Sequence, residues 1–116
     1  MSNVRLALSP MHSGESGGAW WPNSHQPGWE LPEILTVLGR LRWVRLSWDD
    51  WSVHPSVIEL ADGEIPLGWN HGILAHRALF CRSSDYLMLT VIPPETAPQR
   101  ARALLAEAAG FPAASR

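Results

Sequence analysis

Apolar residues recur along the chain at two spacings, which predict strands and helices in turn. Residues 4–9 alternate between apolar and polar side chains, a pattern typical of a half-buried strand. Leucine and isoleucine then recur three or four positions apart over residues 31–41. This spacing predicts a helix that tolerates Pro32 in its first turn and ends near Gly39. A second helix is predicted after residues 96–99, a capping-box pattern with proline inside the first turn.

Alternation returns between the two helices and predicts several more strands. Residues 42–48 place Trp43 and Arg45 on the face opposite that of Val44, Leu46 and Trp48. Residues 77–82 form a short apolar run, and residues 86–92 are apolar on both faces apart from one threonine. A strand of the second kind is expected to be central in its sheet and covered on both sides.

A hairpin is predicted around Asp62-Gly63, which separates the apolar runs 57–60 and 65–69. In the register that this turn favours, Leu60 faces Ile65 and Ile58 faces Leu67. Pro66 conflicts with a regular ladder because it has no N–H to donate, so a bulge or an edge position is expected there.

Together these elements predict an α+β fold, a twisted and mostly antiparallel sheet of about five to six strands with two helices packed on it. The length of 116 residues fits a single domain, residues 1–116. Residues 10–28 read as one long loop, and residues 113–116 as a frayed tail. The first strand and the strand at 42–48 flank a helix, so they are expected to be parallel or not adjacent.

Composition narrows the class of protein without naming a function. The chain is 46% hydrophobic and 17% charged, with a net charge of −2, which argues against a polyanionic partner such as nucleic acid. Cys81 is the single cysteine and has no internal disulfide partner, so a reducing cytoplasm is expected. We expect neither a signal peptide nor a membrane span, because no charged start precedes an apolar run and no apolar run is long enough.

Four sequence blocks are distinctive, namely Gly18-Ala19-Trp20-Trp21-Pro22, Leu31-Pro32, Leu67-Gly68-Trp69 and residues 93–98. They resemble an actinobacterial family known only as domain of unknown function 5994 (DUF5994), and the resemblance covers nearly the whole chain. Family members often carry an arginine after Trp-Trp-Pro, where this chain has Asn23. His76 falls where the family often has a histidine. The family has no established activity, so the resemblance implies no mechanism.

Seven tryptophans are the most unusual feature of the composition. Adjacent side chains of an extended backbone point in different directions, so Trp20 and Trp21 cannot share one environment. One is expected to fill the core, and the other to line a cleft. The predicted cleft for a ligand or partner consists of Trp20, Trp21, Trp69 and His76, with Trp48 and Trp51. The competing interpretation is that these rings only fill the core of a small domain.

Trp43 and Arg45 form a separate candidate. Both lie on the strand face opposite Val44, and an exposed tryptophan there indicates self-association as a homodimer. Arginines beside an aromatic ring are also found where proteins bind single-stranded nucleic acid, but the acidic balance and the nearby Asp49 and Asp50 favour a solvated face.

No recognised catalytic or cofactor motif occurs in the chain. The five histidines lack metal-ligand spacing, so no metal and no cofactor are expected. Cys81 has no evident base partner, and the glycine-rich stretch at 13–18 lacks the lysine of a phosphate-binding loop.

The sequence therefore favours a non-enzymatic binding or protein-interaction module with a Trp-lined cleft. Two alternatives are left open. One is a small-molecule enzyme in which His76 acts as acid or base together with Asp49 or Asp50, and the other is a structural accessory domain.

Overall fold

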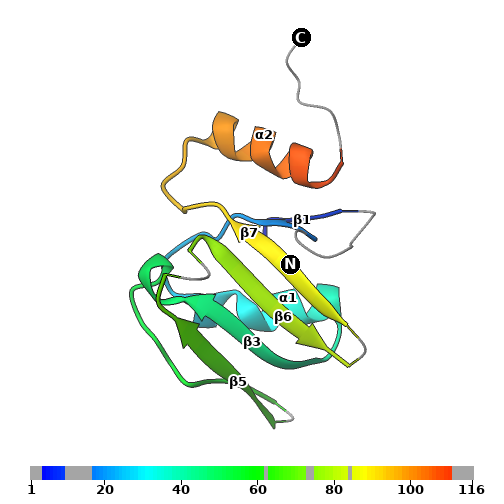
Figure 1. Ribbon diagram of the computed structural model, residues 1–116, viewed down its shortest axis with the longest axis vertical. Coiled ribbons are helices and arrows are strands. Elements are labelled where there is room, and N and C mark those ends of the chain that lie inside the picture. Colours follow the sequence, from blue (N-terminus) through cyan, green and yellow to red (C-terminus); the bar gives the residue numbers. More distant parts are fainter. Residues whose placement is uncertain (1–3, 10–16, 62, 73–74, 84, 111–116) are drawn as a thin grey trace.

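The computed structural model describes residues 4–9, 17–61, 63–72, 75–83 and 85–110. Within these ranges seven strands form one mixed sheet in the order β1-β2-β7-β6-β3-β5-β4 (Figure 1). The strands are β1 (Leu6–Leu8), β2 (Gly18–Trp20), β3 (Leu41–Ser47), β4 (Val57–Leu60), β5 (Gly63–Asn70), β6 (Arg77–Arg82) and β7 (Tyr86–Val91). The helices are α1 (Leu31–Leu38), α2 (Pro98–Ala108) and the short 3₁₀ helices η1 (Pro27–Trp29) and η2 (Trp48–Asp50). The α+β prediction is confirmed, with more strands than expected.

The additional strand is β2, which lies inside the stretch predicted as the loop 10–28. Three residues without alternation give no strand signal. Gly18 has φ +143, and a Cβ added there would meet the carbonyl oxygen of Ala7 at 1.9 Å. A glycine at this position therefore lets β2 approach β1 closely enough to pair with it. The same predicted loop also contains η1.

Four of the strands run in one direction. β2 is parallel to β7 and β3 is parallel to β5, while β6 is antiparallel to both β3 and β7. The carboxyl ends of β2, β7, β3 and β5 therefore meet at one end of the sheet. β1 and β3 are not adjacent, which agrees with one of the two arrangements expected from the sequence.

The main core lies between α1 and one face of the sheet. Its largest member is Trp20, which has no exposed surface and whose ring lies 5.1 Å from Trp51 and 6.3 Å from Phe80. The indole N–H of Trp20 donates to Oε1 of Glu30 at 3.1 Å, and the backbone N–H of Asn23 donates to Oε2 of Glu30 at 2.5 Å. These two donors explain how the carboxylate of Glu30 is accommodated in a buried position.

A second, smaller core lies under α2. It consists of Ala19, Trp21, Ile92 and Ala101, with half-buried leucines of α2 around them. The guanidinium of Arg5 lies 3.6 Å above the Trp21 ring and donates to the carbonyl oxygens of Trp21 and Pro22. Trp20 and Trp21 thus occupy different environments as expected, but both are buried, so neither lines a cleft.

The ends of the helices agree with the sequence in part. α1 ends at Gly39, whose φ of +89 suits glycine, and Gly110 follows α2 with φ +94. The predicted capping box of α2 is not formed. Ala97, not Thr96, is the N-cap residue, and no side chain caps the helix.

The β4–β5 hairpin forms, but in a register two residues away from the predicted one. Ile58 pairs with Ile65 and Leu60 pairs with Gly63, so the same faces stay apolar. The backbone N–H of Leu67 donates to the Ser56 carbonyl. Pro66 therefore falls at a position of the β4–β5 ladder where no N–H is needed, and the expected bulge or edge position is not required.

Two further expectations differ in detail. Trp48 leaves the strand and starts η2, because β3 ends at Ser47. β7 is interior to the sheet, but only the face with Leu87, Leu89 and Val91 is buried.

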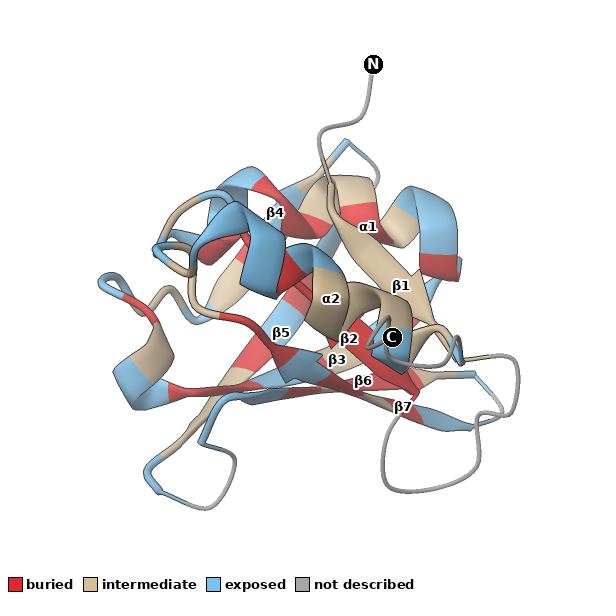
Figure 2. Cartoon of the chain, turned by 90° about the horizontal axis from the view of Figure 1, so that it is seen from above, coloured by how far each residue is buried: buried red, intermediate tan, exposed pale blue. Residues whose placement is uncertain are grey.

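In Figure 2, β3, β6 and β7 run along the lower side of the molecule, and both α-helices lie above them. The predicted tail 113–116 and His12 lie outside the described residues. No helix in the described ranges is both long and apolar enough to span a bilayer.

Candidate functional site

Histidines gather at the end of the sheet where the four codirectional strands finish. His25 follows β2, His54 follows η2, His71 follows β5 and His76 precedes β6. Each of these four contacts a residue of η2, the three-residue turn that follows β3. In open α/β sheets, ligands bind beyond the carboxyl ends of parallel strands, and β3 and β5 form such a pair here. This histidine-rich end is therefore the candidate site.

Asp50 and His76 form the best-defined polar pair of the histidine-rich end. Nδ1 of His76 lies 2.9 Å from Oδ1 of Asp50, and the backbone N–H of His76 donates to Oδ2 at 2.9 Å. The Asp50 side chain is only 6% exposed. Its burial raises the pKa of the carboxyl group, and the nearby His76 opposes that shift. Asp50 therefore fixes the imidazole with Nδ1 as the donor, and in the neutral ring Nε2 is then the acceptor.

The backbone conformation of His76 is also unusual. It has φ +58, a left-handed conformation that is uncommon for a residue other than glycine. Two contacts to one carboxylate hold the residue in that conformation. Strained residues of this kind cluster at functional sites. Of the two carboxylates that the sequence offered to His76, the structure brings Asp50 to it.

His25 links two other parts of the same end. Its Nδ1 lies 3.1 Å from the Asp50 carbonyl oxygen and its Nε2 lies 2.9 Å from Oε1 of Glu95. Both partners accept hydrogen bonds, so both ring nitrogens must donate, which only the protonated ring can do. The hydrogen bond to the Asp50 carbonyl, followed by Glu95, raises the pKa of His25 despite its partial burial.

This raised pKa predicts a pH-dependent contribution of His25 to stability. The contribution is complete below the unfolded pKa, about 6.5, and is lost as the pH rises through the higher folded pKa. The difference in Tm between the wild type and His25→Gln should therefore be larger at pH 5.5 than at pH 8.5. Thermal denaturation followed by circular dichroism at the two pH values measures it.

Glu95→Gln serves as the control, because it keeps the hydrogen bond to Asp50 and removes the charge at Nε2. Glu95→Gln should reduce the pH dependence of the stabilisation by His25, measured as a difference in Tm, without abolishing it. Equal differences in Tm at both pH values would contradict the protonated pairing.

Four rings pack together beside these polar pairs. Trp48 stacks on His54 with centroids 3.5 Å apart and planes 2° from parallel, and it meets His71 at 5.0 Å and 29°. Trp69 approaches both Trp48 and His54 edge-on, and its N–H donates to the Pro55 carbonyl. We refer to Trp48, His54, Trp69 and His71 as the ring cluster.

The polar atoms of the ring cluster are partly fixed. Nε2 of His54 lies 2.8 Å from the Trp48 carbonyl oxygen, so that nitrogen donates, and in the neutral ring Nδ1 is then the acceptor. Beneath the cluster, Ser47 and Asn70 are cross-strand neighbours at the ends of β3 and β5. Their buried side-chain oxygens have no hydrogen-bond partner among the described residues.

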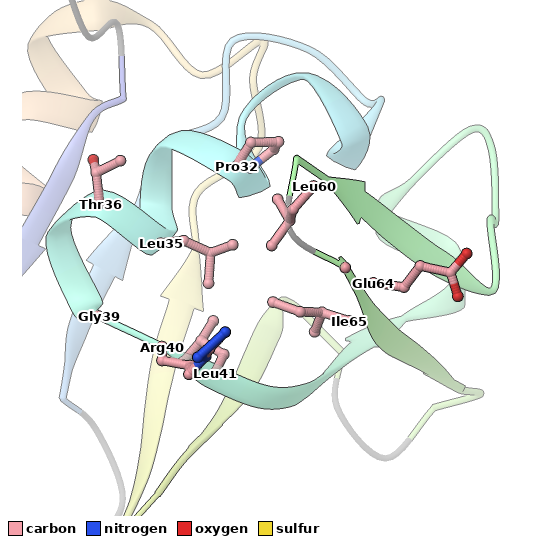
Figure 3. A pocket seen from close by; sticks show the side chains of 10 residues that line it. Pro32, Leu35, Thr36, Gly39, Arg40, Leu41, Leu60, Glu64 and Ile65 are labelled. Carbon is pink, nitrogen blue, oxygen red and sulfur yellow. The ribbon is translucent and has the colours of Figure 1, made fainter.

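The predicted tryptophan cleft is therefore only partly assembled. Trp48 and Trp69 meet, and His76 contacts Asp50 of the same 3₁₀ helix η2 as Trp48. Trp20, Trp21 and Trp51 are instead buried in the two cores. The groove in Figure 3, with a volume of about 490 Å³, lies elsewhere, between α1 and the β4–β5 hairpin. Aliphatic residues such as Leu35, Leu60 and Ile65 line it, and no tryptophan does.

Metal-ligating side chains do not gather in the described part of the chain. No group of three or more histidine, cysteine or acidic side chains is arranged there to hold a metal ion. Cys81 is buried, and its thiol is directed to the Arg82 carbonyl.

Comparison with known proteins identifies a family and nothing more specific. The family model of DUF5994, a family of unknown function, matches residues 5–108. The chain belongs to the DUF5994 family. The match covers β1 through α2 and so includes every residue of the histidine-rich end of this DUF5994 protein. Neither a curated protein nor a solved structure matches the chain.

Sequence reasoning did not place His25, His54, His71 and Glu95 in the site of the DUF5994 protein. Their positions in the sequence are spread over 71 residues, from 25 to 95. Each lies just beyond or just before a strand, but that signal becomes useful only when the directions of the strands are known. For His25 the strand is β2, which the sequence did not reveal.

Proposed function

We propose that this DUF5994 protein is a non-enzymatic binding module whose binding surface is the ring cluster. The proposed ligand is a small molecule with a planar ring that carries hydrogen-bond donors. The observation that carries the proposal is Trp48, an indole that is 39% exposed yet held in one orientation by neighbouring rings.

An exposed indole that is already fixed in one orientation is suited to ligand binding, because its side chain loses little entropy when the ligand binds. Stacking on His54 and the edge contact with Trp69 fix the Trp48 ring before any ligand arrives, so little side-chain entropy is lost on binding. His71 is exposed and lies over the indole with a tilt of 29°. The proposed ligand replaces this exposed imidazole and stacks on Trp48 in its place.

The surrounding polar atoms favour donors on the ligand. Nδ1 of His54 and Nε2 of His76 are the nitrogens that the internal hydrogen bonds leave as acceptors. The exposed carboxylate of Asp49 adds a further acceptor on η2. A planar ring with N–H or O–H groups, such as a purine nucleoside or a phenol, matches this set.

The indole N–H signals in ¹H–¹⁵N spectra provide a direct test. The seven tryptophans give up to seven such signals, and a panel of purine nucleosides, phenols and aliphatic sugars supplies the probes. We expect purine nucleosides or phenols, and not the sugars, to shift the signals of Trp48 and Trp69. Trp48→Ala should weaken this binding roughly 5- to 150-fold, because stacking on an aromatic ring contributes roughly 1–3 kcal/mol.

Two further variants sharpen the test. His71→Ala should bind at least as tightly as the wild type, because the ligand no longer has to displace a ring. Trp29→Ala, which removes a 73% exposed indole outside the ring cluster, should leave binding unchanged. The proposal is wrong if no compound shifts any indole signal, or if Trp48→Ala binds as well as the wild type.

Acid–base catalysis by His76 is the second candidate. A specific observation favours it, namely that a buried carboxylate orients the imidazole and leaves Nε2 directed away from Asp50. The same panel separates the two candidates. If a compound that binds is also chemically converted, and His76→Gln stops the conversion while binding persists, catalysis replaces simple binding as the function.

A further inference from the structure

One face of the sheet carries apolar side chains where solvent-facing strands normally carry polar ones. Three neighbouring strands contribute to it in two cross-strand rows. Trp43, Cys81 and Tyr86 form the first row, and Arg45, Leu79 and Met88 form the second. Figure 1 looks onto this side of β7, β6 and β3, with α1 behind the sheet. We refer to these two rows, together with Pro66 and Gly68 of β5, as the open face.

The side chains of the open face are ordered by contacts with one another. The Trp43 ring lies 5.8 Å from Tyr86, and the guanidinium of Arg45 lies 5.4 Å from the centre of the Trp43 ring. Tyr86 is nevertheless 65% exposed. At Gly68 a Cβ would meet the Arg45 side chain at 3.2 Å, so the absent side chain gives Arg45 room to lie across β5. Beside Trp43 a hollow of about 250 Å³ is lined by Arg45, Pro66 and Gly68.

The helices leave this face uncovered in the described chain. α2 packs on β1 and β2, and α1 packs on the opposite side of the sheet. β7 has the sequence of a strand that is buried on both faces, yet Met88 is half-buried and Tyr86 is exposed. An apolar surface of this kind marks a site of association.

We propose that the open face is the interface of a symmetric homodimer, in which it packs against the same face of a second copy of the chain. The charges around the face favour a second copy as the occupant. Arg45 and Arg77 lie on β3 and β6, while Glu59 and Glu64 lie opposite each other on β4 and β5. All four are exposed. In an isologous contact the arginines of one copy can face the glutamates of the other. A polyanion would instead be repelled by the glutamates.

The inference is independent of the proposed function, because the ring cluster lies at the carboxyl ends of the strands and shares no residue with the open face.

Sedimentation equilibrium of the wild type over a range of concentrations tests the proposal. We expect a reversible monomer–dimer equilibrium. Trp43→Glu and Tyr86→Glu should each raise the dissociation constant of the dimer about 30-fold or more, because each puts a charge among the apolar side chains of the interface. Tyr86 is largely exposed, so its variant is expected to fold even if Trp43→Glu does not, and circular dichroism verifies the fold of each.

Trp29→Glu is the matched control, because it makes the same change at an exposed tryptophan away from the open face. It should dimerise like the wild type, and so should Trp48→Ala from the ring cluster. A wild type that stays monomeric at its solubility limit overturns the proposal. A dimer that survives in a folded Tyr86→Glu variant also overturns it, because the contact must then lie elsewhere.

Discussion

Replacement of Trp20 by alanine is expected to lower the free energy of unfolding by about 3–5 kcal/mol, the range for deleting a large aromatic side chain from a core. Trp20 has no exposed surface and bridges Trp51 and Phe80. The substitution also removes the indole N–H that Glu30 accepts, so a buried carboxylate loses one of its donors. Urea denaturation followed by circular dichroism measures the change.

Two variants separate burial from the loss of an aromatic ring in general. Trp29→Ala removes an indole that is 73% exposed and should change stability by no more than about 0.5 kcal/mol. Trp20→Phe keeps part of the ring volume and loses the donor to Glu30, so its cost should fall between those of the two alanine variants. Equal stabilities of the wild type and Trp20→Ala would contradict the core described here.

The second large effect is expected for Gly18→Ala. The backbone at Gly18 has φ +143, and the added Cβ would lie 1.9 Å from the Ala7 carbonyl oxygen. Backbone strain alone costs roughly 1–3 kcal/mol. The contact with Ala7 adds to this cost, because β1 must move away and its pairing with β2 is then disturbed.

Glycines elsewhere in the chain provide matched controls for Gly18→Ala. Gly39 has φ +89 but open space where a Cβ would lie, so Gly39→Ala tests backbone strain without the clash. Gly28 has open space and no left-handed φ, so Gly28→Ala should be nearly neutral. The order of destabilisation measured in urea should be Gly18, then Gly39, then Gly28. If Gly18→Ala costs no more than Gly39→Ala, the close approach of β1 and β2 is not as described.

The parts of the fold that the sequence predicted share a local signal. α1 is predicted from apolar spacing and from Gly39 at its end, and both are confirmed. The β4–β5 hairpin is predicted from its turn residues, but the register differs by two because pairing Leu60 with Gly63 brings Pro66 to a position that needs no N–H. A shift by two keeps the same side chains in the core, so the apolar pattern cannot distinguish the two registers.

The parts that the sequence did not predict depend on contacts between distant segments. β2 is three residues long, and it becomes a strand because β1 and β7 flank it. Burial of Trp20 and Trp21 on opposite faces likewise depends on α1 and α2, which come later in the chain. The sequence predicts that His76 pairs with either Asp49 or Asp50. The choice between Asp49 and Asp50 rests on the shape of η2, which local propensity does not determine.

The position of β2 also constrains when the protein can fold during synthesis. β1 and β2 join the sheet only through β7, whose residues lie near the other end of the chain. While the ribosome makes the polypeptide, β1 and β2 can pair with each other but cannot join the rest of the sheet until Val91 of β7 has left the exit tunnel. The β3–β5–β4 portion at the other edge of the sheet can form earlier, and the β1–β2 pair joins the sheet last.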